Sequence, residues 1–473
     1  MATDLTKGSP LKQIFFFSIP YLIGNLFQQF YNIADMVIVG RTISPEAYAA
    51  VGSTGSLVWF TVGAMQSLTV GFSTITARHV GAGDPEGIKR SFAASIKLTA
   101  LIALLMSVVC TLLCRPMLEL LRTPDDIINR SYIYLFWIFA GLVATAFYNL
   151  LSNMIRALGD SRTPLYFLII ACVINIILDF LFIAVCGMDT DGAGLATVVA
   201  QLISALCCVV YIVKKRPELH VERRHFVHDG GMNRLLLGVG IPMAFLNMVL
   251  SIGSIVMQFV TNGLGTAYVS AQATGSKIET FVTQPLLSIG SAVSVYTAQN
   301  YGAKKYDRLI EGGKKASVLG FLWCVIATLI MIPAGKFIVV LLAGNEVTQN
   351  VIDNAYLYIV VNTALILIVM PLVVYKNILQ AVGRTFWTMM SGFTEIGARA
   401  GLSVLVIYLM NTGILADQTG FFVMCFANPA AWLTGLLTIV LDYMFLMRKF
   451  KGLALEQNMM RREDGYPPIN EQM

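Results

Sequence analysis

Twelve long apolar stretches run through this chain of 473 residues and constrain its fold more than any other feature. Each is near or above the ~20 residues with which a helix crosses a bilayer. Hydrophobic residues make up 56% of the chain and charged residues 13%, against about 25% charge in soluble domains. Because backbone groups in hydrocarbon have to be hydrogen-bonded within their own segment, we predict an all-α integral membrane protein with twelve transmembrane helices. The stretches cover residues 14–40, 47–78, 90–114, 127–156, 163–187, 191–213, 232–263, 267–300, 310–342, 350–382, 385–411 and 417–447.

Basic residues predict which way the chain faces, because loops rich in Lys and Arg stay in the cytoplasm. With the N-terminus inside, the cytoplasmic segments hold 24 of the 33 basic residues, whereas the loops at 261–268 and 411–418 hold none. The N-terminal MATDLTKGSPLKQ lacks a signal-peptide cleavage pattern, so we expect the first span to be retained. We therefore predict a multi-pass protein of the inner (cytoplasmic) membrane with both termini in the cytoplasm. The net charge of +6 then reflects topology, and we expect no nucleic-acid partner.

The chain also contains an internal duplication. Four pairs of segments match at nearly constant offsets of 222, 220, 221 and 224 residues. The pairs are Ile19-Pro20 with Ile241-Pro242, AYAAVGSTGS (47–56) with AYVSAQATGS (267–276), ARHVGAG (77–83) with AQNYGAK (298–304), and RALGDSRT (156–163) with QAVGRTFW (380–387). These offsets favour two homologous six-helix bundles at 1–213 and 235–450, with a cytoplasmic linker at 214–234 and a cytoplasmic tail at 451–473. Transporters built from two such repeats bind their substrate between them.

Asp35 is the first charged side chain that the apolar pattern does not explain. Counting back along its helix gives Asn32, Gln28 and Asn25, at spacings of three, four and three residues, so the four side chains share one helical face. A carboxylate in hydrocarbon costs several kcal/mol unless it faces protein or water, and amides also need partners there. We therefore predict that this polar face points into the N-terminal bundle, where Asn25, Gln28 and Asn32 are candidates for contact with substrate.

A second acid, Asp179, lies in the fifth stretch four residues after Asn175, so these two side chains also share a face. Thr197 follows the glycines of GAGLAT in the sixth stretch and could add a hydroxyl oxygen. Two carboxylates with an amide and a hydroxyl suit a hard cation such as sodium, and two neighbouring acids also suit a proton carrier. The alternative is structural: Asp35 or Asp179 hydrogen-bonds a helix end, and Asn175 and Thr197 join helices.

Several segments together give the chain a specific resemblance to a known family. It resembles the multidrug and toxic compound extrusion (MATE) transporters over about residues 10 to 450. The segments that carry this resemblance are IPYLIGNLFQQFYNIADMVIVGR, the glycine-containing opening of the second stretch, ARHVGAGD, IRALGDSRTP, INIILDFLFI and GAGLAT.

The resemblance implies twelve helices in two bundles around a central V-shaped cleft, and export of organic cations driven by inward movement of sodium or protons. It also implies that Asp35, Asn175, Asp179 and Thr197 form the cation site of the N-terminal bundle, and that Pro20 is where the first helix bends. A proline removes a helix hydrogen bond, so a bend at Pro20 agrees with its chemistry. We expect a monomer in the bilayer that needs no cofactor apart from the coupling ion.

The C-terminal half departs from the N-terminal one in its charges. Met257 aligns with Asp35, and the seventh stretch contains no acid, so we place the coupling site in the N-terminal half. Glu279 is a candidate for contact with a cationic substrate. Glu395 and Arg399 are four residues apart, so we predict an ion pair between them along one helix.

Two other functions are compatible with an all-helical membrane protein. A lipid-linked saccharide flippase of the same broader superfamily is the alternative, but it would be expected to carry basic residues that meet phosphates. A membrane-embedded enzyme would need a nucleophile with its base, or a metal cluster, within the spans. The apolar stretches contain neither a nucleophile with its base nor a metal cluster, so we do not expect an enzyme.

Overall fold

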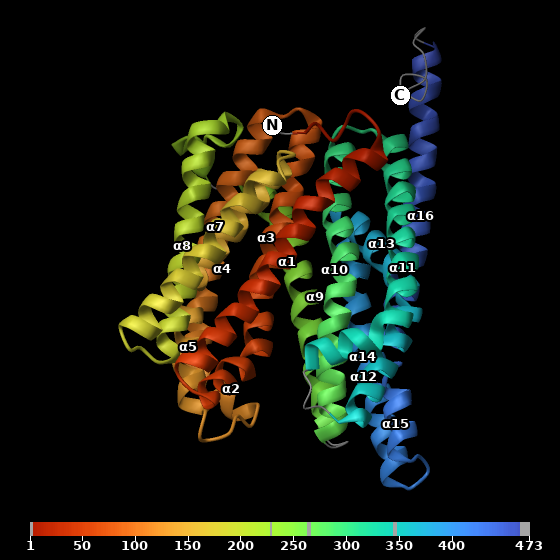
Figure 1. Ribbon diagram of the computed structural model, residues 1–473. Coiled ribbons are helices and arrows are strands. Elements are labelled where there is room, and N and C mark those ends of the chain that lie inside the picture. Colours follow the sequence, from red (N-terminus) through yellow and green to blue (C-terminus); the bar gives the residue numbers. More distant parts are fainter. Residues whose placement is uncertain (1–2, 228, 263–265, 344–347, 464–473) are drawn as a thin grey trace. The chain divides into compact units, whose positions relative to one another are not determined.

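The computed structural model describes residues 3–227, 229–262, 266–343 and 348–463 (Figure 1). These residues form sixteen α-helices, one π-helical turn and three short 3-10 turns, and no strand occurs among them. In the first half the elements are α1 (Pro10–Thr42), α2 (Pro45–Ser53), α3 (Gly55–Ala82), α4 (Pro85–Leu120), α5 (Ile128–Ala140), α6 (Leu142–Ala157), α7 (Arg162–Asp179), the π turn (Phe180–Val185), α8 (Thr190–Lys215) and two 3-10 turns (Pro217–Leu219 and Arg223–Phe226). In the second half they are α9 (Gly230–Asn262), α10 (Thr266–Gly302), α11 (Tyr306–Ala343), α12 (Gln349–Ala364), a 3-10 turn (Ile366–Ile368), α13 (Val369–Ala381), α14 (Thr385–Asn411), α15 (Asp417–Met424) and α16 (Ala427–Glu463).

The all-α membrane fold predicted from the sequence is confirmed. Each predicted stretch coincides with one helix or with helices that follow one another across a short break. Eight described segments are long and apolar enough to cross a membrane, and a ninth is added if α5 and α6, bent by 48° at Gly141, form one span. Helices α1, α3 and α10 have 33, 28 and 37 residues but do not meet the same criterion of apolar composition. The count of twelve spans therefore stays a prediction.

The chain divides into two compact units. Unit 1 comprises Met1–Leu5, Ile19–Met248 and Tyr301–Lys304, and unit 2 comprises Thr6–Ser18, Val249–Asn300 and Lys305–Met473. Helix α1 passes from unit 2 to unit 1 just before Pro20, and α9 passes from unit 1 to unit 2 after Met248. The domain limits predicted from the sequence stay predictions.

Unit 1 has an apolar core between α3, α4, α6, α8 and the first part of α9. Helices α3 and α9 touch through their backbones, because a Cβ atom on Gly71 would lie 2.6 Å from the Cα atom of Gly240. Small residues allow this close approach. The resulting van der Waals packing stabilises the helix pair in a bilayer, where there is no hydrophobic driving force between helices. A larger side chain at either glycine would push the two helices apart.

A buried ion pair fixes the loop between α6 and α7 in unit 1. Asp160 is 3% exposed and pairs with Arg216, which follows the end of α8. The same carboxylate accepts hydrogen bonds from the hydroxyls of Thr163 and Tyr211, both at 2.8 Å, and from the backbone N–H of Thr163 at 3.1 Å. The preceding Gly159 has φ of 88°, and its carbonyl accepts a hydrogen bond from the N–H of Thr3 at 3.0 Å. This loop is therefore held by charge, by hydrogen bonds and by a turn that favours glycine.

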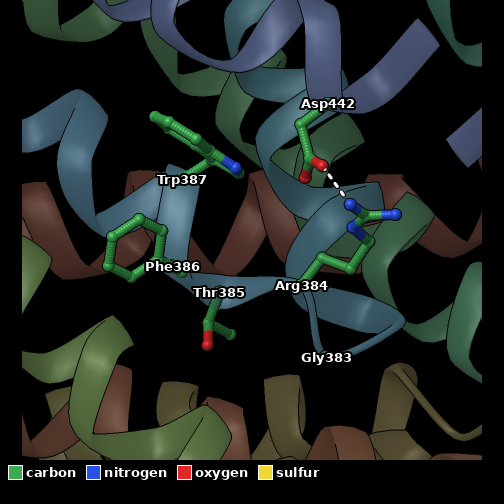
Figure 2. Close-up of a pocket in the computed structure, with 6 residues that line it drawn as sticks. All are labelled: Gly383, Arg384, Thr385, Phe386, Trp387 and Asp442. Atoms are coloured by element: carbon green, nitrogen blue, oxygen red, sulfur yellow. Dashed lines mark ion pairs between the residues drawn. The ribbon is translucent and has the colours of Figure 1, made fainter. Parts of the chain in front are cut away.

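Unit 2 fixes the matching loop with the charges exchanged (Figure 2). Arg384, at the position of Asp160 by the offset of 224, pairs with Asp442 on α16, the last helix of unit 2. Gly383 has φ of 80°, as Gly159 does in unit 1. The pair lines a cavity of about 270 Å³ together with Gly383 and the first three residues of α14, Thr385, Phe386 and Trp387. The two halves thus keep the same connection but reverse its polarity.

Candidate functional site

Unit 1 buries both anomalous acids in its interior. Asp35 on α1 is 4% exposed, and Asn175 and Asp179 on α7 are fully buried. The two carboxylates are close enough to interact electrostatically. Among the described residues, no Lys, Arg or His forms an ion pair with either of them. The interior of unit 1 therefore carries acid groups without a basic partner.

Hydrogen bonds connect two tyrosines and three of the predicted site residues, in two separate sets. The hydroxyls of Tyr31 and Thr197 are 2.9 Å apart, and the amide of Asn175 donates to the Thr197 hydroxyl at 3.4 Å. The hydroxyl of Tyr134 on α5 donates to Oδ2 of Asp35 at 3.5 Å. Both tyrosines interact electrostatically with Asp35 and Asp179. The structure thus gathers Asp35, Asn175, Asp179 and Thr197 in the interior of unit 1, and their role as a cation site stays a prediction.

Four buried oxygen atoms in this cluster have no hydrogen-bond partner in the described structure. They are Oδ1 of Asp35, Oδ1 of Asn175 and both carboxylate oxygens of Asp179. An unpaired buried acceptor costs about 1–3 kcal/mol, and an unpaired charge costs more. A sodium ion would supply the missing positive charge to hard oxygen ligands, and a proton would neutralise one carboxylate. The oxygen set therefore fits either coupling ion.

Local helix geometry positions these side chains. Asp179 is the last residue of α7, and the π turn begins at the next residue. Single π turns within helices change the register of the backbone and are frequent at functional sites. On α8, a Cβ atom at Gly194 would lie 3.0 Å from the carbonyl oxygen of Tyr134, so only a glycine lets α8 approach α5 this closely. Thr197 follows Gly194 by three residues on α8 and reaches Tyr31 and Asn175.

The prediction that the whole polar face of α1 points into the bundle is wrong. Asp35 is buried and Asn25 is half-buried, but Gln28 and Asn32 are exposed. Helical spacing placed the four side chains on one face but did not indicate what packs against that face at each turn. Contact of Asn25, Gln28 and Asn32 with substrate stays a prediction.

Pro20 is buried inside α1, and the helix continues through it. Its assignment as a bending point stays a prediction.

Glu279 in unit 2 has partners within the protein. It is half-buried on α10, and its Oε2 accepts a hydrogen bond from the hydroxyl of Tyr358 at 2.6 Å. The amide of Asn428 donates to both carboxylate oxygens at 3.3 and 3.2 Å. Met257, which aligns with Asp35, is buried. Contact of Glu279 with substrate stays a prediction.

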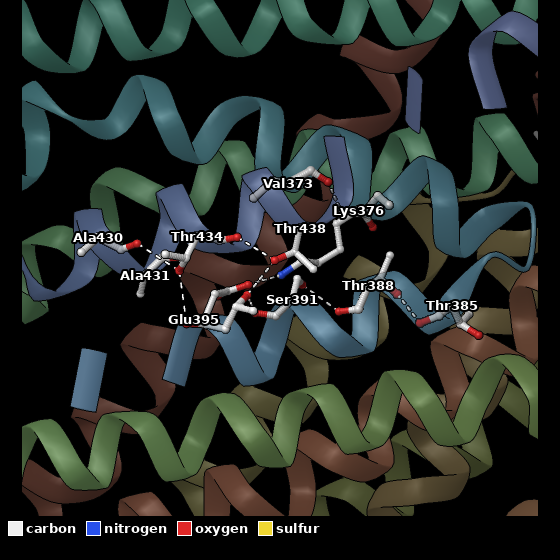
Figure 3. Close-up of polar contacts among 12 residues, drawn as sticks. Val373, Lys376, Thr385, Thr388, Ser391, Glu395, Ala430, Ala431, Thr434 and Thr438 are labelled. Atoms are coloured by element: carbon white, nitrogen blue, oxygen red, sulfur yellow. Dashed lines mark hydrogen bonds and ion pairs between the residues drawn. The ribbon is translucent and has the colours of Figure 1, made fainter. Parts of the chain in front are cut away.

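The predicted ion pair between Glu395 and Arg399 is wrong. Glu395 is paired with Lys376 on α13 at 2.7 Å, and Figure 3 shows the Lys376 amine directed at this carboxylate. The Nε–H of Arg399 donates instead to Oδ1 of Asn428 at 3.0 Å. In a membrane interior, long charged side chains reach partners on neighbouring helices, so spacing along one helix does not decide the pairing.

Tyr31 and Tyr134 were missed by the reasoning from sequence. Tyrosine is common in membrane helices, so neither residue stands out alone. The repeat held a signal for Tyr134, because SYIY at 131–134 matches AYLY at 355–358 at the same offset of 224. Tyr31 lies one helical turn before Asp35 and could have been found from that spacing.

Comparison with known proteins identifies a family through a sequence profile. The sequence profile of the MatE family matches residues 20–181 and 242–405, one match in each half. The chain is 26% identical over 453 residues to the probable multidrug resistance protein YoeA of Bacillus subtilis, covering 94% of this chain and 96% of that protein. It is 24% identical over 352 residues to the FAD transporter of Shewanella oneidensis, covering 73% and 76%.

Solved structures agree in fold. A transporter of the MOP superfamily from Pyrococcus furiosus, described as having a binding pocket of reverse polarity, superposes with a TM-score of 0.85 at 20% identity, over 95% of this chain and 99% of the other. A MATE protein crystallised in a bent conformation gives the same TM-score at 20% identity, over 95% and 100%. With a family profile matched in both halves, this multi-pass membrane protein belongs to the MATE family of transporters.

Proposed function

We propose that this transporter exports organic cations or drugs across the cytoplasmic membrane in exchange for inward-moving sodium ions or protons. The observation that supports this proposal is the buried pair Asp35 and Asp179, with three unpaired carboxylate oxygens and no basic partner among the described residues. The free energy of such a site falls when a cation or a proton binds there, because the buried negative charge is neutralised.

Coupling follows from differential affinity for two conformations. A ligand shifts a conformational equilibrium only if it binds one state better than the other. Asp35 and Asp179 would bind the coupling ion most strongly when they are shielded from water, and release it when water solvates their charges. Asn175 and Thr197 would add neutral oxygen ligands, and Tyr31 and Tyr134 would hold the site residues in place through their hydroxyls.

The class of substrate is supported by charge and by relatives. The buried carboxylates Asp35 and Asp179 have no basic partner among the described residues of unit 1, which favours cationic cargo over phosphates. YoeA is named as a probable multidrug resistance protein, and this does not favour the saccharide flippase. The FAD transporter is similar at comparable identity, so the test should include an anionic flavin as well as organic cations.

The decisive experiment separates the two gradients. The purified protein is reconstituted into liposomes, and efflux of a fluorescent organic cation is followed with a sodium gradient, a proton gradient, or neither. We expect at least one gradient to accelerate efflux above the rate without a gradient. Liposomes without protein, and liposomes whose gradient has been collapsed by an ionophore, serve as controls. Equal efflux under all three conditions would contradict coupled export.

We also propose that both termini and the linker lie in the cytoplasm, because these segments hold most of the Lys and Arg residues. Glu218→Cys in the linker and Ala416→Cys between α14 and α15 would be compared in a background with the native cysteines replaced. Both positions are exposed. An impermeant thiol reagent should label Ala416→Cys in intact cells and Glu218→Cys only after permeabilisation, and the reverse pattern would overturn the topology.

A further inference from the structure

The duplication allows unit 2 to be compared with unit 1 residue by residue around the acid cluster. The family profile begins at residues 20 and 242 and ends at residues 181 and 405, so the offset rises from 222 to 224 between its ends. At these offsets four unit 1 residues have clear counterparts in unit 2. The aligned pairs are Tyr31 with Gly253, Tyr134 with Tyr358, Asn175 with Arg399, and Asp179 with Ser403.

One feature of the unit 1 cluster recurs in unit 2. Tyr134 donates to the Asp35 carboxylate, and its counterpart Tyr358 donates to the carboxylate of Glu279. The acid has changed helix, since Asp35 lies on the first helix of its half and Glu279 on the second. Unit 2 therefore keeps a buried tyrosine against a carboxylate at the same place in the repeat.

A positive charge has appeared where unit 1 has an amide. Arg399 stands at the position of Asn175 and is 8% exposed, and it is linked to Glu279 through Asn428, with no direct ion pair between the two among the described residues. Its Nε–H donates to Oδ1 of Asn428, whose amide donates in turn to Glu279 and to the Tyr358 hydroxyl. The counterpart of the second acid, Ser403, is neutral and fully buried. The cluster thus contains one carboxylate and one guanidinium.

A glycine makes room for this guanidinium. A Cβ atom on Gly253 of α9 would lie 3.0 Å from Nη1 of Arg399. In unit 1 the aligned residue is Tyr31, whose large side chain reaches Thr197, and the same Thr197 hydroxyl accepts a hydrogen bond from the short Asn175 on α7. In unit 1 the first position has a large side chain (tyrosine) and the second a small one (asparagine). In unit 2 the first is glycine and the second is the large arginine. This exchange is independent of the charges and indicates that Arg399 occupies a defined space.

We propose that Glu279, Tyr358 and Asn428 form a second cation site, at the repeat position of the unit 1 cluster, whose permanent occupant is the guanidinium of Arg399. The tethered cation neutralises Glu279 in every conformation, so unit 2 needs no ion from solution. It follows that each transport cycle uses coupling ions in unit 1 alone, and this consequence rests on the proposed function. The occupancy of the site does not depend on it.

The test removes the tethered cation and offers a free one. The Arg399→Ala variant of the full chain, purified in detergent, would be compared with wild type by thermal unfolding in rising concentrations of methylguanidinium below the denaturing range. We expect the melting temperature of the variant to fall by several degrees. Methylguanidinium should then raise it along a saturating curve, because a ligand that binds only the folded state stabilises it. The wild-type protein should show no such rise.

Two controls separate this effect from non-specific action. The double variant Arg399→Ala/Glu279→Gln has no carboxylate to neutralise, so it should lose the methylguanidinium response. Arg115→Ala removes an exposed arginine paired with the exposed Glu119, and should neither lower the melting temperature nor confer a response. A folded Arg399→Ala variant without a selective response, or an equal response in the double variant, would overturn the proposal.

A second pair of variants keeps the proposal testable if Arg399→Ala does not fold. Gly253→Ala places a methyl group against Nη1 of Arg399, so we expect it to lower the melting temperature in wild type and to lower it less in the Arg399→Lys background. The helix propensity gained by alanine is the same in both backgrounds and cancels. Equal effects would show that no guanidinium fills this space. None of these measurements uses a gradient, so their failure is distinct from failure of the proposed export.

Discussion

Asp35→Asn and Asp179→Asn are each expected to reduce gradient-driven efflux at least about tenfold, within the range of coupling free energies known for linked sites. Asparagine keeps the shape of the side chain but removes the charge that would attract the coupling ion. Because neither carboxylate has a basic partner among the described residues, we expect the folded protein to remain as stable as wild type or to become more stable. The measurement is the initial efflux rate from proteoliposomes at matched protein content.

A matched control is Asp353→Asn, which makes the same chemical change at an exposed aspartate paired with Lys336. Its efflux rate should equal that of wild type. If Asp35→Asn and Asp179→Asn both transport at the wild-type rate under either gradient, the coupling site lies elsewhere in the chain.

Reversal of the charge at the α6–α7 loop is expected to have the largest effect on stability. Asp160→Arg places two guanidinium groups against each other in a buried site, and loss of a buried ion pair costs about 3–5 kcal/mol. The double variant Asp160→Arg/Arg216→Asp should recover part of this loss, because unit 2 holds the corresponding pair with that polarity. Recovery should be incomplete, since the hydrogen bonds from Thr163 and Tyr211 to Asp160 are lost. Apparent melting temperatures at one scan rate would measure both effects, and a double variant no more stable than the single one would contradict them.

Low pH should reduce the stability that the Asp160 carboxylate gives to the loop between α6 and α7. Burial raises the pKa of Asp160, but the hydrogen bonds from Thr163, Tyr211 and Arg216 lower it more, so the pKa lies below its usual value. A lowered pKa gives stability that is present above the unfolded value of about 3.9 and is lost as the pH falls through the folded value. The difference in stability between wild type and Asp160→Asn should therefore be constant near neutral pH and shrink below about pH 4. A difference that stays constant into that acidic range would exclude this role for the carboxylate.

The sequence predicted the helical fold well because hydropathy over ~20 residues is a strong and local signal. It did not predict the bend at Gly141 or the π turn after Asp179, since both depend on how neighbouring helices pack. The acids of the candidate site were found because carboxylates are costly in spans. Tyr31 and Tyr134 were not, because their role depends on which acid each hydroxyl reaches.

The two predictions from helical spacing that were wrong, one about an ion pair and one about burial, failed for the same physical reason. The spacing of Glu395 and Arg399 allowed an ion pair, but Lys376 on another helix and Asn428 on α16 were better placed. Likewise, the spacing of Gln28, Asn32 and Asp35 gave a common face, but only Asp35 is covered by other helices. Periodicity describes one helix, whereas burial and pairing are properties of several helices together.

The two loop ion pairs have opposite polarity, and this affects how a duplicated chain assembles in the membrane. It disfavours contacts between the loop of one half and the final helix of the other. While the spans assemble, the loop carrying Asp160 could meet the final helix of either half, because the halves share sequence and helix order. At its own final helix it meets Arg216, and at the other it would meet Asp442, so the mismatched contact brings two carboxylates together. Arg384 would be repelled in the same way by Arg216 in such a mismatched contact. Opposite signs at equivalent positions thus penalise domain-swapped topologies that a chain with two identical pairs would tolerate.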